Sequence, residues 1–76
     1  MNGDVIMEYK TSEIMRALYE QSGLSYSAMA RALGIKRNTL ATWLRGKRNP
    51  SPLVVDMACI KLNVDKDDIL KRLKGE

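Results

Sequence analysis

RALGIKRNTLATWLRGKRNP, residues 31–50, carries six cations and one tryptophan but no carboxylate. At about 100° per residue, a helix over residues 37–45 separates into two faces. One face carries Leu40, Trp43 and Leu44, whose apolar side chains predict burial. The opposite face is polar and lacks acid, and it is formed by Arg37, Asn38, Ala41, Thr42 and Arg45. The spacing therefore predicts a helix that buries one side and presents a cationic side outward.

The polar face of this helix has a composition suited to the major groove of DNA. Arg37 can bond guanine O6 and N7 together, Asn38 can do the same for adenine, and Thr42 can bond either base edge or meet a thymine methyl. Ala41 allows a close approach. Residues at the ends of the helix and in the following loop would meet phosphates: Lys36, Arg45, Lys47, Arg48 and Asn49. A basic face that is only solvated is the plainer alternative.

The net charge of +4 is unevenly distributed along the chain. Residues 1–20 carry a net charge of −2, and residues 56–76 balance five cations with five carboxylates. Residues 21–55 carry +6 and contain no Asp or Glu. Such clustering predicts a polyanionic partner.

Start and stop signals predict an all-α fold of five short helices. Glycines at 23, 34 and 46 would end the first three, and Ser25, Ser51 and Asp65 are favourable N-caps for the second, fourth and fifth. The expected helices lie near residues 12–22, 25–33, 36–45, 51–62 and 65–74. Lys36 is an exception, because a lysine at the N-cap cannot accept from the free backbone amides and opposes the positive helix end. An anion bound there would relieve that defect.

Length and composition exclude several classes of protein. Seventy-six residues give one small domain with a thin core, which suits a binding module. The chain has no histidine and one cysteine, so histidine triads, histidine zinc sites and an internal disulfide are excluded, and Cys59 is interpreted as a small core residue. No run approaches the ~20 apolar residues of a membrane span, and we expect a cytoplasmic protein without cofactors or metals.

The arrangement of the second and third helices is that of a helix-turn-helix, in which the second member enters the major groove. Here the sequence resembles the Cro and phage-repressor type, also called the xenobiotic-response-element type. The resemblance covers about residues 14–70 and is carried by Leu24-Ser25, Met29-Ala30, Leu33-Gly34-Ile35, Leu40 and the string from Trp43 to Pro50, WLRGKRNP. It implies a compact five-helix DNA-binding domain, which we place at residues 12–76. The apolar residues at positions 5, 6, 7 and 9 separately suggest an N-terminal arm at residues 1–11 that is flexible or strand-like.

Carried over position by position, the resemblance implies base reading by Arg37, Asn38, Ala41 and Thr42. It adds Ser25 and Tyr26 to the backbone-contacting positions already assigned to Lys36, Arg45, Lys47, Arg48 and Asn49. The chain departs from the family at three places: Tyr26 stands where glutamine is frequent, Lys36 where a serine or threonine cap is common, and Leu44 where glutamate is frequent. Leu44 predicts an apolar junction in place of a salt bridge.

These observations predict a sequence-specific regulator of transcription, in a bacterial or phage context, that binds double-stranded DNA. A homodimer would read a palindromic operator with half-sites about 34 Å apart or multiples of it, and would repress by occupying the operator. The last helix or residues 1–10 would make the dimer contact. The alternative is the antitoxin of a toxin-antitoxin pair, which also binds its own operator. An enzyme is not expected, because no catalytic constellation is present.

Overall fold

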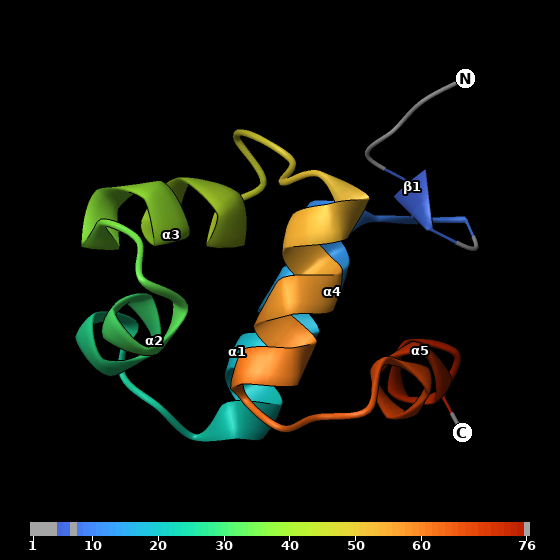
Figure 1. Cartoon of the computed structure of the whole chain (residues 1–76). Helices are drawn as coiled ribbons and strands as arrows, with labels where there is room; N and C mark the ends of the chain where they lie inside the picture. The colour runs from blue at the N-terminus through green and yellow to red at the C-terminus, as the bar shows by residue number, and fades with distance from the viewer. Residues whose placement is uncertain (1–4, 7, 76) are drawn as a thin grey trace.

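The computed structural model describes residues 5–6 and 8–75, which form five helices and one short hairpin (Figure 1). The elements in chain order are β1 (Val5–Ile6), β2 (Tyr9–Lys10), α1 (Thr11–Ser22), α2 (Tyr26–Leu33), α3 (Arg37–Leu44), α4 (Pro52–Lys61) and α5 (Lys66–Leu73). Each helix falls on its expected range. The prediction of an all-α, five-helix domain is confirmed.

The hairpin formed by β1 and β2 leads directly into α1. Its strands pair antiparallel, with Ile6 opposite Tyr9. The backbone amide of Lys10 donates to the carboxylate of Glu13 at 3.1 Å, which satisfies one of the amides that the start of a helix leaves free. Of the arm expected at residues 1–11, residues 1–4 and 7 lie outside the described residues. The division into arm and domain stays a prediction.

Three of the expected N-cap residues form side-chain hydrogen bonds to the first turns of their helices. The hydroxyl of Ser25 accepts from the amide of Ala28 at 3.1 Å, and that of Ser51 accepts from Val54 at 3.3 Å. The carboxylate of Asp65 accepts from the amide of Asp67 at 2.9 Å. These bonds satisfy otherwise free amides, each typically stabilising its helix by ~1 kcal/mol. The caps therefore fix where these helices begin, although each helix is too short to be stable alone.

The core lies between α1 and the other four helices. In Figure 1, α4 runs in front of α1, with α2 and α3 on one side and α5 on the other. Helix α1 contacts α3, α4 and α5, and α2 contacts α3 and α4. Each helix supplies at least one fully buried side chain to the core: Ile14, Met15, Leu18, Met29, Leu40, Val55 and Ile69. The interpretation of Cys59 as a core residue agrees with its 4% exposure, and burial raises the pKa of its thiol.

The loop between α3 and α4 is fastened to the start of α1. The buried hydroxyl of Thr11 donates to the backbone carbonyl of Pro50. Beside it, the backbone amide of Ser12 donates to the side-chain oxygen of Asn49 at 3.3 Å. Because the two bonds join residues more than 35 positions apart, they fix where the loop lies relative to the core.

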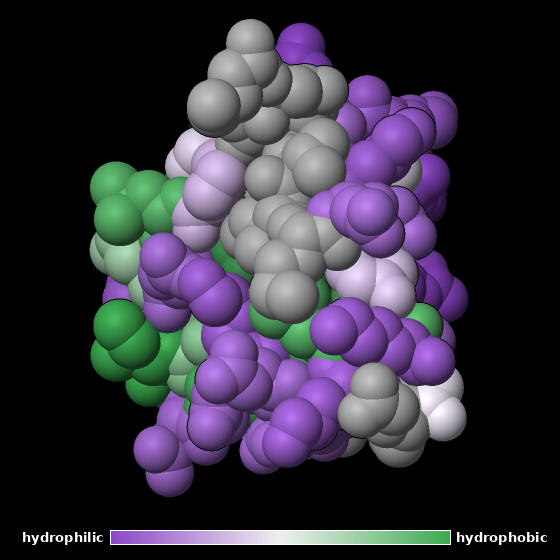
Figure 2. Space-filling model, turned by 90° about the vertical axis from the view of Figure 1, so that its right-hand side faces the viewer, coloured by the Kyte–Doolittle hydropathy of each residue, from purple (hydrophilic) through white to green (hydrophobic). Residues whose placement is uncertain are grey.

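Large apolar side chains that remain exposed gather on one helix. Among the described residues these are Leu53, Met57 and Ile60, which are 67%, 46% and 77% exposed. All three belong to α4. Figure 2 shows hydrophobic surface along its left edge, which is the side of the molecule that faces the reader in Figure 1. Within the described residues, no helix is long and apolar enough to span a membrane.

Candidate nucleic-acid interface

A tight turn between α2 and α3 sets the direction of α3. Gly34 has a φ of +73°, a left-handed conformation that favours glycine, and the amide of Ile35 donates back to the carbonyl of Ala30 at 3.0 Å. The ammonium of Lys61, on α4, donates to the carbonyl of Leu33 at 3.2 Å. That cation lies at the negative end of α2, where the helix dipole favours it. The helix pair is therefore held at its turn by a third helix.

Helix α3 buries one side and exposes the other, as its sequence predicts. Leu40 is fully buried and Leu44 is 5% exposed, whereas Arg37 and Asn38 are exposed. Trp43 is half-buried and packs against the core. The indole is thus held by the protein and does not stand free as a stacking surface. The two faces of α3 have the orientation that a helix needs to enter a groove.

Thr42 lies one turn after Asn38 and differs from it in what it can offer a base. Its hydroxyl donates to the backbone carbonyl of Asn38 at 2.8 Å, so the proton is engaged within the helix. The oxygen lone pairs and the methyl group of Thr42 remain available for contact with a base. Thr42 is therefore better suited to accept from a base or to meet a thymine methyl than to donate. Ala41 and Thr42 are both half-buried, so Arg37 and Asn38 are the more exposed of the four expected base-reading residues.

The cations of residues 31–50 carry charge that no carboxylate compensates. All six are exposed, and none forms an ion pair or a side-chain hydrogen bond within the described residues: Arg31, Lys36, Arg37, Arg45, Lys47 and Arg48. By contrast, Arg16, Lys66 and Arg72 are paired with acids elsewhere on the molecule. Unpaired exposed cations retain their full field for an external polyanion.

Lys36 occupies the N-cap of α3 without making a side-chain bond to the helix. Its backbone is extended, as an N-cap requires, but its side chain has no acceptor for the free amides. The start of α3 therefore carries an unpaired ammonium beside unsatisfied N–H groups. Both are donors to an anion, and a phosphate at this position would accept from them.

Two of the expected phosphate contacts lie at the start of α2. Ser25 is exposed, and because its oxygen accepts from Ala28, its hydroxyl proton is still available to an anion. Tyr26 is half-buried, with its ring edge-on to that of Tyr19 at 5.1 Å between centroids. Tyr19 was not expected near the site from sequence. It sets where the ring of Tyr26 lies.

Asn49 is placed differently from its predicted neighbours in the loop. Lys47 and Arg48 are exposed, but Asn49 is half-buried and its side-chain oxygen is bonded to Ser12. In this structure the side chain of Asn49 braces the loop. The structure thus leaves Lys47 and Arg48 exposed and sets the side chain of Asn49 against the start of α1.

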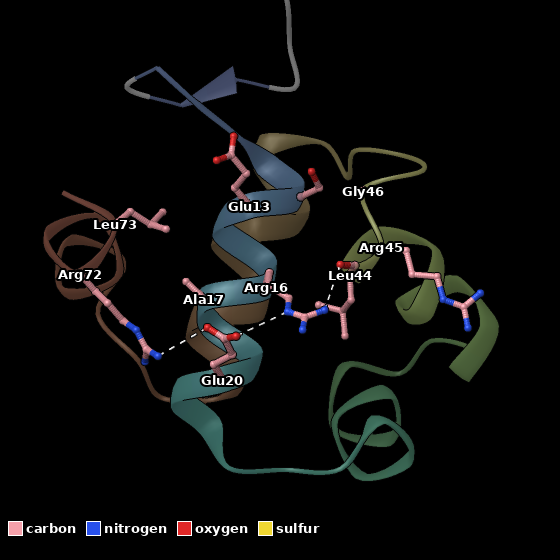
Figure 3. A pocket seen from close by; sticks show the side chains of 10 residues that line it. Glu13, Arg16, Ala17, Glu20, Leu44, Arg45, Gly46, Arg72 and Leu73 are labelled. Carbon is pink, nitrogen blue, oxygen red and sulfur yellow. Dashed lines mark hydrogen bonds and ion pairs between the residues drawn. The ribbon is translucent and has the colours of Figure 1, made fainter. Parts of the chain in front are cut away.

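A pocket of about 440 Å³ lies beside the end of α3, lined by residues of α1, α3 and α5 and of the loop after α3. Figure 3 shows the guanidinium of Arg45 turned away from Glu20 and Arg16. Arg45 thus remains directed outward although a carboxylate lines the same pocket. Among the described residues, no group of three or more acidic or cysteine side chains is placed to hold a metal ion.

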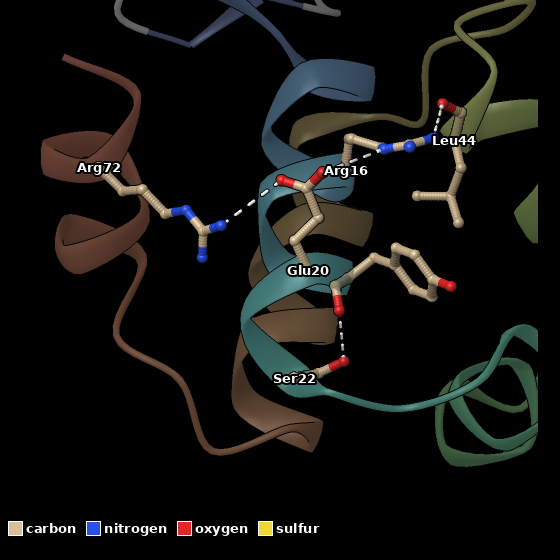
Figure 4. A network of polar contacts seen from close by, with 6 residues as sticks. Arg16, Glu20, Ser22, Leu44 and Arg72 are labelled. Atoms are coloured by element: carbon tan, nitrogen blue, oxygen red, sulfur yellow. Dashed lines mark hydrogen bonds and ion pairs between the residues drawn. The ribbon is translucent and has the colours of Figure 1, made fainter. Parts of the chain in front are cut away.

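Arg16 was not recognised from the sequence as part of the site, yet it contacts α3. One of its terminal nitrogens donates to the backbone carbonyl of Leu44 at 3.3 Å. Glu20 lies between Arg16 and Arg72, at 3.6 Å from the first and 3.5 Å from the second (Figure 4). The junction at Leu44 is therefore apolar in its side chain, as expected, but it is also bonded through its backbone. The spacing of four between Arg16 and Glu20 was the one signal in the sequence.

A short helix, a glycine turn and a second helix with an unpaired cationic face define a DNA-binding helix-turn-helix protein. Comparison with protein families agrees: the helix-turn-helix family HTH_3 matches residues 15–69. The chain belongs to this family, which is the Cro and repressor type that the sequence resembles, and it is a DNA-binding transcriptional regulator. The family is regulatory and not enzymatic. No curated protein and no solved structure gives a significant match.

Proposed function

We propose that the protein is a sequence-specific repressor, which binds a palindromic operator as a homodimer and blocks transcription by occupying it. The observation that carries the proposal is the division of α3, with Leu40 and Leu44 buried while Arg37 and Asn38 are exposed without internal partners. A helix of this kind can read base edges without first breaking contacts inside the protein.

The assignment of roles follows the positions of the side chains. Four residues of α3 would face base edges: Arg37, Asn38, Ala41 and Thr42. Phosphates on either side would be contacted from α2, from the start and end of α3 and from the loop after it: Ser25, Tyr26, Lys36, Arg45, Lys47, Arg48 and Asn49. Asn49 would contribute mainly by holding the loop, since its oxygen accepts from Ser12.

Repression is favoured over activation by the position of the acids. Glu20, which lines the pocket beside the end of α3, is engaged with Arg16 and Arg72. A carboxylate paired in this way is a poor surface for recruiting another protein. Occupation of the operator, which excludes other proteins from the same DNA, requires no further contact.

A binding selection from a random double-stranded DNA library tests the proposal. The purified chain should enrich a palindrome at both of two salt concentrations. Its affinity should fall as the salt concentration rises, because the Lys and Arg side chains that bind phosphates release counterions from the DNA. A pool that stays unselective at both concentrations would refute operator recognition. An asymmetric consensus would refute the dimer alone.

A further inference from the structure

The polar face of α3 has methyl groups at its centre. Its first turn carries Arg37 and Asn38, and Arg45 follows its end. Ala41 and Thr42 lie between these polar residues and are half-buried. The side chain of Ala41 is a methyl group, and Thr42 bears one beside its hydroxyl. The middle of this face therefore offers a base edge an apolar contact between two polar ends.

The hydroxyl of Thr42 is held by the backbone of its own helix. It donates to the carbonyl of Asn38 at 2.8 Å, and this bond keeps the oxygen against α3. The methyl group is attached to the same carbon and takes a different staggered position, so it does not take part in that bond. The two halves of the side chain are thus separated, with the polar half engaged inside the helix.

A polar contact between Thr42 and a base has a cost that an apolar contact avoids. To donate to a base, the hydroxyl must leave the carbonyl of Asn38, so one hydrogen bond replaces another with little net gain. To accept from a base, the oxygen must be reached where it lies against the helix backbone. The methyl group can be contacted without either change. The geometry therefore favours an apolar contact by Thr42.

The surface beside Thr42 is hollowed, which leaves room for such a contact. The hollow has a volume of about 340 Å³ and is lined by Thr39, Thr42, Trp43 and Arg48. Thr39 contributes a second methyl group, and the half-buried ring of Trp43 contributes apolar surface. An apolar group that met the methyl of Thr42 would lie close to further apolar surface, and its removal from water is favourable.

The apolar group that the major groove displays is the C5 methyl group of a pyrimidine. Thymine carries this methyl group, and unmodified cytosine does not. Uracil is thymine without the methyl group, and 5-methylcytosine is cytosine with it. A side chain that contacts this group therefore distinguishes pyrimidines by their methylation and not by their hydrogen-bonding edges.

We propose that Thr42 contacts the C5 methyl group of one pyrimidine in each half-site, so that binding depends on the methylation of that base. The proposal rests on the proposed function, because it names the chemical group that α3 reads at one position of the operator. Thymine supplies the methyl group in unmodified DNA. An operator with cytosine at that position is bound more tightly once the cytosine is methylated.

The first test changes the DNA and leaves the protein as it is. Each thymine of the selected palindrome is replaced in turn by uracil in both half-sites, and affinity is measured by competition. Burial of one methyl group is worth about fourfold in affinity, so we expect about a fourfold loss per half-site at one position or more. At that position 5-methylcytosine should bind more tightly than cytosine by a similar factor. A half-site that contains no thymine would overturn the proposal.

Two variants then assign the effect to Thr42. Thr42→Val keeps a methyl group and loses the hydroxyl, whereas Thr42→Ser keeps the hydroxyl and loses the methyl group. The quantity compared is the ratio of affinities for the thymine and uracil forms of the operator. We expect Thr42→Val to retain a ratio of about fourfold per half-site and Thr42→Ser to bind the two forms alike. The reverse pattern would show that the hydroxyl reads the base, which would overturn the proposal.

The outcomes separate this proposal from the proposed function. A palindrome that is selected, yet is bound as tightly with uracil at every thymine position, would overturn the methyl contact and leave operator recognition intact. A pool that stays unselective would refute the proposed function and the methyl contact with it. Thermal unfolding shows whether both variants are folded. If either is not, the uracil and 5-methylcytosine operators still decide the proposal with the unaltered chain.

Discussion

The guanidinium of Arg16 on α1 donates to the backbone carbonyl of Leu44 at the end of α3, at 3.3 Å. The last carbonyls of a helix have no partner within it, and a cation is favoured at that end. Arg16 therefore satisfies the end of α3 while fixing where that end lies against α1. Glu20 in turn holds Arg16 and Arg72.

Arg16→Ala should loosen the end of α3 and weaken specific DNA binding. A bond from a charged donor is worth about 1.5–3 kcal/mol, but the Arg16 side chain is 49% exposed, so we expect a loss near ~1 kcal/mol in the free energy of unfolding. Thermal unfolding and operator titration measure the two effects. Arg72→Ala is the control, since it shares Glu20 but does not bond α3. Equal losses of DNA affinity in both variants would contradict a role at α3.

Arg37→Ala should relax base preference at one position of each half-site. Loss of a two-bond contact with guanine costs about 1–3 kcal/mol of discrimination there and little at other positions. Competition titrations with single-base variants of the operator measure it. Thermal stability should not change, because the side chain of Arg37 is exposed and forms no hydrogen bond or ion pair within the described chain. A uniform loss over all sequences would show that Arg37 contacts a phosphate.

Lys47→Ala should weaken binding to all DNA sequences alike. A lysine that meets a phosphate contributes through counterion release, so the slope of log affinity against log salt should fall by about 1. Lys71→Ala removes an exposed cation from α5 instead and is expected to leave the slope unchanged. A Lys47→Ala variant that changes the preferred DNA sequence but not the salt slope would contradict a phosphate contact by Lys47.

Lys36→Ser should make the protein more stable and a weaker DNA binder. Serine can accept from the free amides of α3, which Lys36 does not, and the cation at the positive helix end is removed. A gain of about 1 kcal/mol would raise the melting temperature by about 4–8 °C in a domain of this size. Calorimetry and DNA titration report both effects. Higher stability with unaltered DNA affinity would show that no phosphate binds at Lys36.

Stability should fall in alkaline solution because of two groups near α4. Burial raises the pKa of the Cys59 thiol from 9.0, and the hydrogen bond that Lys66 donates to Asp56 raises the pKa of Lys66 from 10.5. In both cases the folded state holds its proton more tightly, so the stabilisation is complete below the unfolded pKa and is lost as pH rises through the folded pKa. Urea denaturation from pH 8 to 11 measures this fall. It should begin at higher pH in Cys59→Ala, and a pH-independent midpoint in the wild type would refute both assignments.

The fold could be predicted because its signals are local. Glycines with positive φ at 23 and 34 and side-chain caps at Ser25, Ser51 and Asp65 act within a turn of the chain. The two faces of α3 could be predicted for the same reason, since Leu40 and Leu44 follow the helical period. The roles of the DNA-contacting residues stay predictions.

The long-range contacts could not be predicted from one sequence. Arg16 reaches Leu44 across 28 residues and Thr11 reaches Pro50 across 39, and nothing near either residue indicates its partner. The exposed apolar face of α4 could not be predicted from the sequence either. The helix, PLVVDMACIK, is apolar nearly all round, so its periodicity does not show which side is buried. Only packing distinguishes Val55 from Leu53.

The hydrogen bonds from Thr11 and Ser12 hold Pro50 and Asn49 against the start of α1 and so limit the movement of the loop before them. The loop that carries Lys47 and Arg48 already has its shape before DNA arrives. Pre-organisation of this kind reduces the conformational entropy lost on binding. On the proposed assignment, Lys47 and Arg48 would engage phosphates without first ordering the loop, and the bonds at the N-terminal turn of α1 would govern how readily they do so.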